Sequence, residues 1–297
     1  MSLLAQAMEP AVLNAAWNRL KVEHTPWTEA IGRQQLQRDL MQHLLTCREE
    51  VLAGRYRPEP LRCFHVAKTD GSQRPLVAQY LRDKLVQRAL LAVLTPRAEA
   101  LFHPDSYAYR PGRGVNKALA AAHQRIQQGQ GWLVDADVSQ FFETIPLAQL
   151  RRKLQAFIRD AGALRLIDQW LQQGSQTTGL LGTARGIPQG AVLSPLFCNL
   201  YMHEFDNALA QQGIAFVRFA DDFLLFADNQ VNANRYLDYA QHKLTRMGLA
   251  LNPAKTRVTL SSPDTIFLGK PLLEAKPSVS HKHRSSPFNL IPSFFNL

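Results

Sequence analysis

The sequence has few cysteines and no long apolar run. Its three cysteines, Cys47, Cys63 and Cys198, show no paired spacing. This excludes a disulfide framework and a zinc ribbon, and it predicts a reducing, cytoplasmic compartment. No apolar stretch approaches the roughly 20 residues of a membrane span, so no membrane partner is expected. Residues 1–10 lack a basic segment followed by an apolar core, and therefore predict no signal peptide.

Acidic side chains are also in the minority. The 297 residues include 34 Lys and Arg but 24 Asp and Glu, which gives a formal net charge of +10 and a pI of about 9.8. This balance predicts a polyanionic partner such as nucleic acid, bound with salt-sensitive affinity. A merely basic protein is the alternative. The length suffices for one large or two small domains with a real core.

Two adjacent aspartates, Asp221 and Asp222, lie between two apolar runs in residues 215–227. Short apolar runs of this kind predict buried strands, with the aspartates at a tight turn between them. Neighbouring carboxylates repel each other, so one of them resists ionisation unless a cation is present. The alternative is an acidic surface turn between core strands.

A second acidic stretch lies upstream, where residues 131–142 predict a strand that ends at Asp137 and is followed by two aromatic residues. One strand-end carboxylate and two on a neighbouring hairpin make a hard-oxygen site that suits Mg²⁺. Two such ions, about 3.5–4 Å apart, would activate an attacking hydroxyl and stabilise the leaving oxygen of a phosphoryl displacement.

These residues resemble those of a known family. Residues 219–222, Phe-Ala-Asp-Asp, are similar to the catalytic box of bacterial reverse transcriptases of the group II intron-like and CRISPR-associated type. Asp137 with the aromatic pair at 141–142 resembles the first catalytic box of the same palm, 84 residues earlier. Residues 185–196, with Gly-Ile-Pro-Gln-Gly and Ser-Pro, form the most specific single match. Glycines and a proline ahead of a helix let the backbone approach a ligand closely.

The resemblance implies an α+β fold of the right-hand polymerase kind. We expect fingers and a ferredoxin-like palm sheet with packed helices, and no complete thumb. The expected parts are an N-terminal helical extension at 1–60, fingers at 61–130, a palm at 131–273 that includes part of the fingers near 185–200, and a disordered tail at 274–297. The residues predict helices at 9–21, 33–53, 80–101, 115–128 and 231–247, and one or two helices at 147–173. A further helix is expected to follow the 185–196 segment and to run to about residue 210.

The family also assigns roles to residues at matching positions. The implied catalytic residues are Asp137, Asp221 and Asp222, and the implied ligands of two Mg²⁺ ions are Asp137, Val138, Asp221 and Asp222. The implied nucleotide-binding residues are Lys68, Arg74, Phe142, Gln189 and Lys255.

Three of these nucleotide-binding roles have a physical basis. Asp70 and Gly71 predict a hairpin that carries Lys68 and Arg74 near each other, where two cations suit a triphosphate. A solvated basic hairpin is the alternative. The ring of Phe142 would collide with a ribose 2′-hydroxyl and so favour dNTPs, although it could also be a core residue.

Nucleic-acid contacts are expected from the loop at 106–114 and from the backbone near Gly190. The loop combines tyrosines with Arg110 and Arg113, which can stack on bases and bind backbone phosphates. An ordinary Pro-Gly turn is the alternative.

The resulting hypothesis is RNA-templated addition of dNTPs to a primer with release of pyrophosphate. The expected partners are an RNA template, a DNA or RNA primer and dNTPs, and a CRISPR integrase or another protein that supplies the thumb function. A mobile intron, CRISPR adaptation and phage defence remain open as biological contexts. The alternatives are a non-catalytic or partner-dependent nucleic-acid-binding relic, and a different Mg²⁺ phosphoryl-transfer enzyme such as a nuclease.

Overall fold

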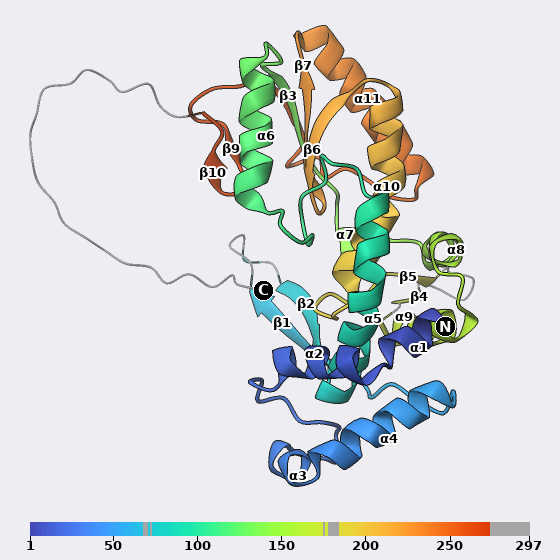
Figure 1. Ribbon diagram of the computed structural model, residues 1–297. Helices are drawn as coiled ribbons and strands as arrows, with labels where there is room; N and C mark the ends of the chain where they lie inside the picture. The colour runs from blue at the N-terminus through green and yellow to red at the C-terminus, as the bar shows by residue number, and fades with distance from the viewer. Residues whose placement is uncertain (68–70, 72, 175, 178–183, 274–297) are drawn as a thin grey trace, which may run out of the picture.

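The computed structural model describes residues 1–67, 71, 73–174, 176–177 and 184–273 (Figure 1). The predicted nucleotide-binding residue Lys68 and the predicted tail at 274–297 lie outside these residues. Figure 1 shows a sheet with helices on both sides at one end of the molecule and a group of helices with a two-stranded hairpin at the other. No helix in the described part of the chain is long and apolar enough to cross a membrane.

The palm is a four-stranded antiparallel sheet in the order β6-β7-β3-β8. Its strands are β3 (Trp132–Asp137), β6 (Ala215–Phe219), β7 (Asp222–Ala227) and β8 (Arg257–Leu260). With helices between β3 and β6 and between β7 and β8, this order is that of a ferredoxin-like βαββαβ unit. The α+β palm expected from the sequence is therefore confirmed.

Alternate residues of the palm strands pack in opposite directions, as the period of a strand requires. Leu133 and Leu224 belong to a cluster with alanines of α6 (Val115–Gln127). Val134 and Phe223 belong to the main core on the other face, which α10 (Ser194–Gln211) and α11 (Gln230–Arg246) cover (Figure 1). Helix α6, which lies within the predicted fingers range of 61–130, packs on the palm sheet through small Ala residues beside β6.

Helices also make up most of the remaining structure. Their bounds are α1 (Leu3–Ala7), α2 (Pro10–Leu20), α3 (Arg33–Arg38), α4 (Leu40–Leu52), α5 (Leu81–Leu101), α7 (Phe141–Thr144), α8 (Leu147–Phe157) and α9 (Ala161–Gly174). The single helix expected at 33–53 is two helices, because the backbone at Asp39 (φ −122°, ψ 32°) leaves the helical region. Aspartate is a weak helix former, so a break there is inexpensive.

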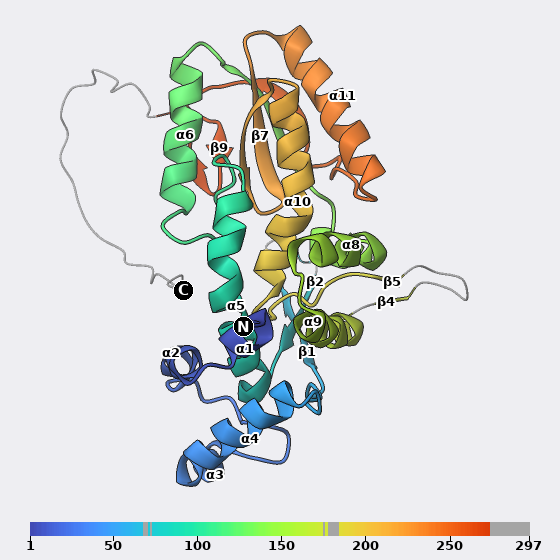
Figure 2. The ribbon, with the colours of Figure 1, turned by 45° about the vertical axis from the view of Figure 1, so that its right-hand side comes forward.

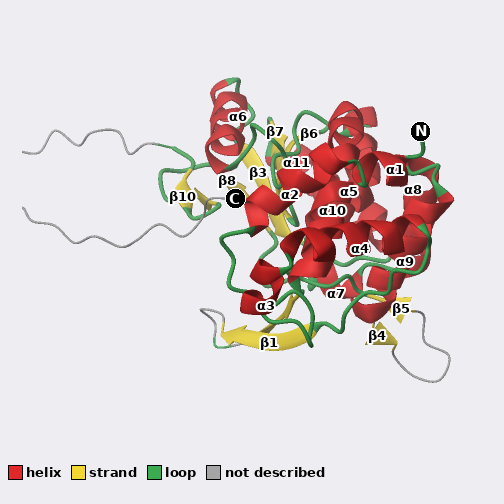
Figure 3. Cartoon of the chain, turned by 60° about the horizontal axis from the view of Figure 1, so that its bottom comes forward, coloured by secondary structure: helices red, strands yellow, loops and turns green. Residues whose placement is uncertain are grey.

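The fingers hairpin consists of β1 (Arg62–Ala67) and β2 (Gln73–Ala78), which pair antiparallel from Ala67↔Gln73 outward. Gly71 between them has φ +80°, a conformation that glycine adopts freely. Figure 3 shows this hairpin apart from the palm sheet. Two short antiparallel pairs complete the described strands, β4 (Gln176–Thr177) with β5 (Ala184–Arg185) and β9 (Ile266–Phe267) with β10 (Lys270–Pro271).

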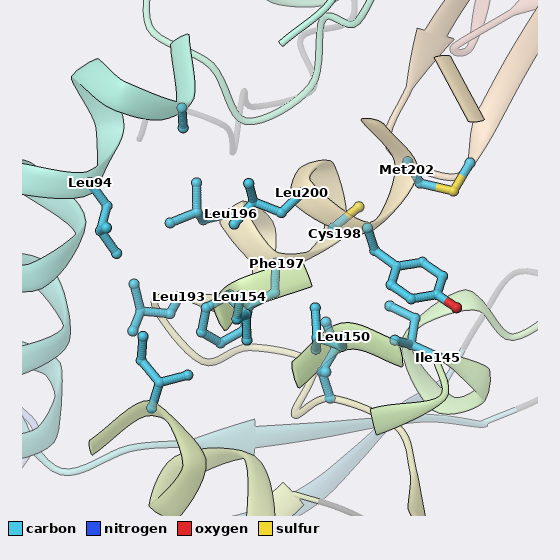
Figure 4. Close-up of a cluster of buried hydrophobic side chains, with 14 of the residues drawn as sticks. Leu94, Ile145, Leu150, Leu154, Leu193, Leu196, Phe197, Cys198, Leu200 and Met202 are labelled. Carbon is cyan, nitrogen blue, oxygen red and sulfur yellow. The ribbon is translucent and has the colours of Figure 1, made fainter. Parts of the chain in front are cut away.

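One continuous core joins the palm to the other helices. Figure 4 shows part of it, where Leu94 of α5, Leu154 of α8 and Phe197 of α10 gather; all three are at most 2% exposed. Helices α5 and α10 lie side by side in Figures 1 and 2. Because α10 begins directly after the 186–193 segment, this packing fixes that segment relative to the palm.

Candidate active site

The hairpin between β6 and β7 carries the adjacent aspartates. Phe219 pairs with Asp222, so the connection has two residues, Ala220 and Asp221. Ala220 has φ +62°, a left-handed conformation that is uncommon for a residue with a side chain. Asp221 therefore lies in the turn itself, whereas Asp222 is the first residue of β7.

The third carboxylate lies beside this hairpin. Asp137, the last residue of β3, is the direct cross-strand partner of Asp222. The amide of Val138 donates a hydrogen bond to the carbonyl of Asp221 at 3.3 Å. The structure thus brings Asp137, Asp221 and Asp222 together at one end of the sheet, as predicted.

The electrostatics of the three aspartates favour a bound cation. Burial, followed by the charges of Asp221 and Asp137, raises the pKa of Asp222 to about 7. Burial is also the main reason that the pKa of Asp221 is raised, with a further contribution from Asp137. Negative charge at this end of the sheet is costly without a counter-ion, and a divalent cation would relieve that cost.

The donor set fits Mg²⁺ in its chemistry, since it consists of carboxylate oxygens. Val138 has a buried apolar side chain, so only its main-chain carbonyl could join them. Among the described residues, no three His, Cys, Asp or Glu side chains are already gathered as metal ligands. Asp137 Oδ2 instead lies 3.3 Å from Lys255 Nζ and 3.3 Å from Asn252 Nδ2. Binding an ion would therefore reorient these carboxylates.

Arg74 acts electrostatically on Asp221, and Asp221 in turn acts on Tyr109. Arg74 is exposed on β2, and its positive charge is among the influences that lower the pKa of Asp221. Tyr109 is 55% exposed as a whole residue, and burial, Cys198 and Asp221 raise the pKa of its hydroxyl to about 12. Sequence reasoning did not single out Tyr109. Its position within the basic aromatic loop was the available signal.

The segment with the Gly-Ile-Pro-Gln-Gly motif lies against the fingers hairpin. The carbonyl of Gln189 accepts a hydrogen bond from the amide of Val77 at 2.8 Å. Gly190 has φ +107°, and a Cβ atom there would lie 2.5 Å from the carbonyl oxygen of Val77. Only glycine fits such a contact, because any side chain would collide with backbone.

Two buried glutamines that sequence reasoning missed complete this arrangement. The side-chain oxygen of Gln79 accepts from the amide of Val192 at 3.0 Å, and that of Gln87 accepts from the amide of Leu193 at 3.2 Å. Both donors lie directly before α10, and Leu193 is its N-cap, whose amide has no partner within the helix. Neither glutamine belongs to a recognisable motif, so no local signal could identify them.

Phe141 and Phe142 occupy different environments. Phe141 is 2% exposed in the core, whereas Phe142 is partly buried with its ring 5.6 Å from that of Phe141. The carbonyl of Phe142 accepts from the amide of Ile187 at 2.7 Å, which ties it to the Gly-Ile-Pro-Gln-Gly segment. Phe142 therefore lies between β3, the strand that ends at Asp137, and the Gly-Ile-Pro-Gln-Gly segment.

The two arginines of the 106–114 loop also differ. Arg110 is buried, with its guanidinium bound to Glu99 and to the carbonyls of His103 and Ser106. This gives Arg110 a bracing role inside the loop. Arg113 is partly exposed and lies over the ring of Tyr107. The predicted contact with nucleic acid suits Arg113 better than Arg110.

A βαββαβ palm with acidic residues on its first strand and following hairpin, and with a basic hairpin nearby, defines the class as nucleic-acid polymerases of right-hand architecture. The family model for reverse transcriptase (RNA-dependent DNA polymerase) matches residues 66–272. The chain belongs to the reverse transcriptase family, and its enzyme class is RNA-directed DNA polymerase. Polymerases of this family generally use divalent metal ions, and its members bind an RNA template and a primer.

Two relatives match the chain in sequence, and one solved structure matches it in fold. The chain is 30% identical to Protein YkfC of Escherichia coli K12, over 86% of this chain and 78% of YkfC. It is 32% identical to the group II intron-encoded protein LtrA of Lactococcus lactis subsp. cremoris, over 56% of this chain but 28% of LtrA. A telomerase structure from Candida tropicalis matches with a TM-score of 0.54 at 13% identity, over 71% of this chain and 52% of that chain, and shows the shared fold alone.

Proposed function

We propose that this chain extends a primer 3′-hydroxyl with dNTPs on an RNA template, with two Mg²⁺ ions held by its aspartates. The observation that carries the proposal is the register that sets Asp137 directly opposite Asp222, with Asp221 in the adjoining turn. In the reaction the primer 3′-oxygen bonds to the α-phosphorus of the dNTP. The bond to the β-phosphate oxygen breaks, pyrophosphate leaves, and the hydroxyl proton passes to solvent.

Asp137, Asp221 and Asp222 would hold the ions, with the carbonyl of Val138 as a further donor. Ions bound there supply Lewis-acid stabilisation of the attacking and leaving oxygens. Lys255 lies on the same side as Asp137 and is 61% exposed, so it can turn toward the departing pyrophosphate as a proton donor or charge partner.

Other residues bind and orient the nucleotide. Arg74 has the charge and exposure to bind the triphosphate, together with the predicted contribution of Lys68. Phe142 stands between the aspartate strand and the Gly-Ile-Pro-Gln-Gly segment, where its ring would exclude a ribose 2′-hydroxyl. Gln189 would contact the nucleotide and Gly190 the nucleic-acid backbone.

The experiment is primer extension on poly(rA)/oligo(dT) with Mg²⁺, comparing wild type with Asp221→Asn. The substitution keeps the size of the side chain but removes its charge, so we expect extension to fall below about 1% of wild type. Asp238→Asn, on the exposed face of α11, is the matched control and should extend normally. Equal extension by wild type and Asp221→Asn would refute the proposed site.

A non-catalytic or partner-dependent nucleic-acid-binding protein is the second candidate, and the net charge of +10 supports it equally. Fluorescence anisotropy with the same labelled primer–template separates the two candidates. Binding without extension by the wild-type chain favours the second candidate, and the assay is then repeated with the neighbouring gene product.

Three biological contexts fit an RNA-directed DNA polymerase of this family. The 32% identity to LtrA, an intron-encoded protein, supports a mobile-intron role first. CRISPR adaptation beside an integrase and phage defence are the others. Co-purification from the native host, followed by sequencing of the bound RNA, distinguishes them, because each context supplies a different template.

A further inference from the structure

The largest fully buried side chain of the described residues belongs to Arg218, three residues before Asp221. Its relative exposure is 0%, and that of its ion-pair partner Asp206 is 1%. Taking two charges out of water is expensive, and a buried pair often adds little stability over apolar residues of the same size. Stability alone is therefore a weak reason for an arginine at this position.

The guanidinium of Arg218 uses all five of its N–H donors. Nε donates to Asp206 Oδ1 at 2.6 Å, and Nη2 donates to Asp206 Oδ2 at 2.6 Å and to Ser106 Oγ at 2.8 Å. Nη1 donates to Asn199 Oδ1 at 3.2 Å and to the carbonyl oxygen of Ala220 at 2.9 Å. Because every donor is engaged, the guanidinium group is held in one orientation. That orientation fixes the carbonyl of Ala220.

These contacts join three separate parts of the chain. Asp206 and Asn199 lie on α10, Ser106 lies in the loop between α5 and α6, and Ala220 lies in the catalytic turn. The Arg218 backbone adds to the connection, because its amide donates to the carbonyl of Asp105 and its carbonyl accepts from the amide of Tyr107, both at 2.9 Å. Arg218 thus connects the turn at Ala220 both to α10 and to the loop at 106–114.

We propose that Arg218, oriented by Asp206, is a positioning residue that holds Ala220 in its left-handed conformation and thereby aims the Asp221 carboxylate. This inference rests on the proposed polymerase function. A left-handed backbone conformation is unfavourable for alanine relative to an ordinary one. The Nη1 contact to the Ala220 carbonyl offsets that cost. A 3.3 Å hydrogen bond from the Val138 amide to the Asp221 carbonyl also holds this turn.

The test removes the Arg218 guanidinium together with its partner carboxylate, so that no unpaired buried charge remains. The double variant Arg218→Met with Asp206→Leu replaces the ion pair by apolar side chains, a change that folded proteins tolerate. We expect its melting temperature to stay near that of wild type. We expect kcat for primer extension to fall at least tenfold, with the KM for dNTP within threefold of wild type.

A third substitution makes the test specific for the turn. Ala220→Gly, added to the double variant, lowers the cost of positive φ and should recover kcat by about five- to tenfold. Leu20→Ala in the buried face of α2 is the control for general destabilisation. It should lower the melting temperature while leaving kcat at 25 °C unchanged, and Ala220→Gly should not improve it.

Hydrogen–deuterium exchange of the peptide covering residues 215–227 gives a readout that is independent of activity. The double variant should exchange faster there than wild type, and Ala220→Gly should restore part of the protection. Wild-type kcat and wild-type exchange in the folded double variant would overturn the inference. So would a loss of kcat that Ala220→Gly does not recover. If wild type itself extends no primer, the proposed function fails, and the exchange comparison alone decides whether Arg218 positions the turn.

Discussion

At the scale of single residues, Gly190 has no room for a side chain. Its φ is +107°, and a Cβ atom added there would approach the Val77 carbonyl oxygen to 2.5 Å, so Gly190→Ala must move backbone. We expect the free energy of unfolding to fall by about 2 kcal/mol or more, from left-handed strain and the clash together. Urea unfolding measures this loss, and primer extension should fall with it.

Gly213→Ala is the matched control for this substitution. Gly213 also has positive φ (+68°), but nothing lies within 4 Å of a Cβ atom there. It should lose only about 1 kcal/mol from backbone strain and retain full extension activity. Equal effects of the two substitutions would show that the contact with Val77 is unimportant.

Asp83 makes stability depend on pH. This buried carboxylate accepts hydrogen bonds from Tyr56 Oη, from Trp170 Nε1 at 3.3 Å and from the amide of Glu59 at 3.1 Å. Burial outweighs these donors and raises the pKa of Asp83 to about 6. The native state then binds a proton more tightly than the unfolded state, so the stabilising contribution is full below the unfolded pKa and is lost as pH rises through about 6.

The comparison with Asp83→Asn isolates this effect, because all other titrations are shared. Between pH 5 and pH 7.5, the free energy of unfolding of wild type should fall by about 1 kcal/mol relative to the variant. Urea unfolding of both proteins at the two pH values measures the difference. A wild-type-to-variant difference that is the same at both pH values would contradict the raised pKa.

At the scale of elements, the start of α10 depends on side chains from the fingers. The two amides directly before α10, at Val192 and Leu193, donate to the side chains of Gln79 and Gln87, which are 2% and 1% exposed. Gln87→Ala would leave a buried amide without a partner and should cost about 1–3 kcal/mol. We expect the KM for dNTP to rise as well, because the segment before α10 loses its anchor.

Gln241→Ala, at an exposed position of α11, is the control for the glutamine change itself. It should alter neither the midpoint of urea unfolding nor the KM. If Gln87→Ala matches this control in both measurements, the link between the fingers and α10 does not position the segment.

At the scale of the whole molecule, the excess of basic over acidic residues governs binding. A chain with a net charge of +10 should bind a primer–template mainly through phosphates, with release of counter-ions. We expect the Kd to rise by at least about tenfold between 50 and 200 mM salt. Arg113→Ala should reduce the slope of log Kd against log salt by about one if Arg113 contacts a phosphate. Anisotropy titrations measure both, and a Kd insensitive to salt would contradict a phosphate-dominated interface.

The sequence alone determined the elements and the chemical class of the site. The apolar runs around Asp137 and Asp221, the hairpin signal at Gly71 and the Gly-Ile-Pro-Gln-Gly segment are local patterns. Local patterns suffice to predict strands, turns and close backbone approaches. They placed three of the four palm strands, the fingers hairpin and all three aspartates, whereas the edge strand β8 was not predicted.

Only the tertiary structure decided which distant residues meet. The register of Asp137 with Asp222 depends on how β3 and β7 align, and a shift of one residue would turn the carboxylates to opposite faces. Arg218 bonds to Ser106, which lies 112 residues away in the sequence. Gln87 accepts from the amide of Leu193, which lies 106 residues away. Gln87 belongs to no motif, and the pattern of the 106–114 loop did not indicate a partner for Ser106. A buried polar group is satisfied by whatever the packed chain brings within hydrogen-bonding distance.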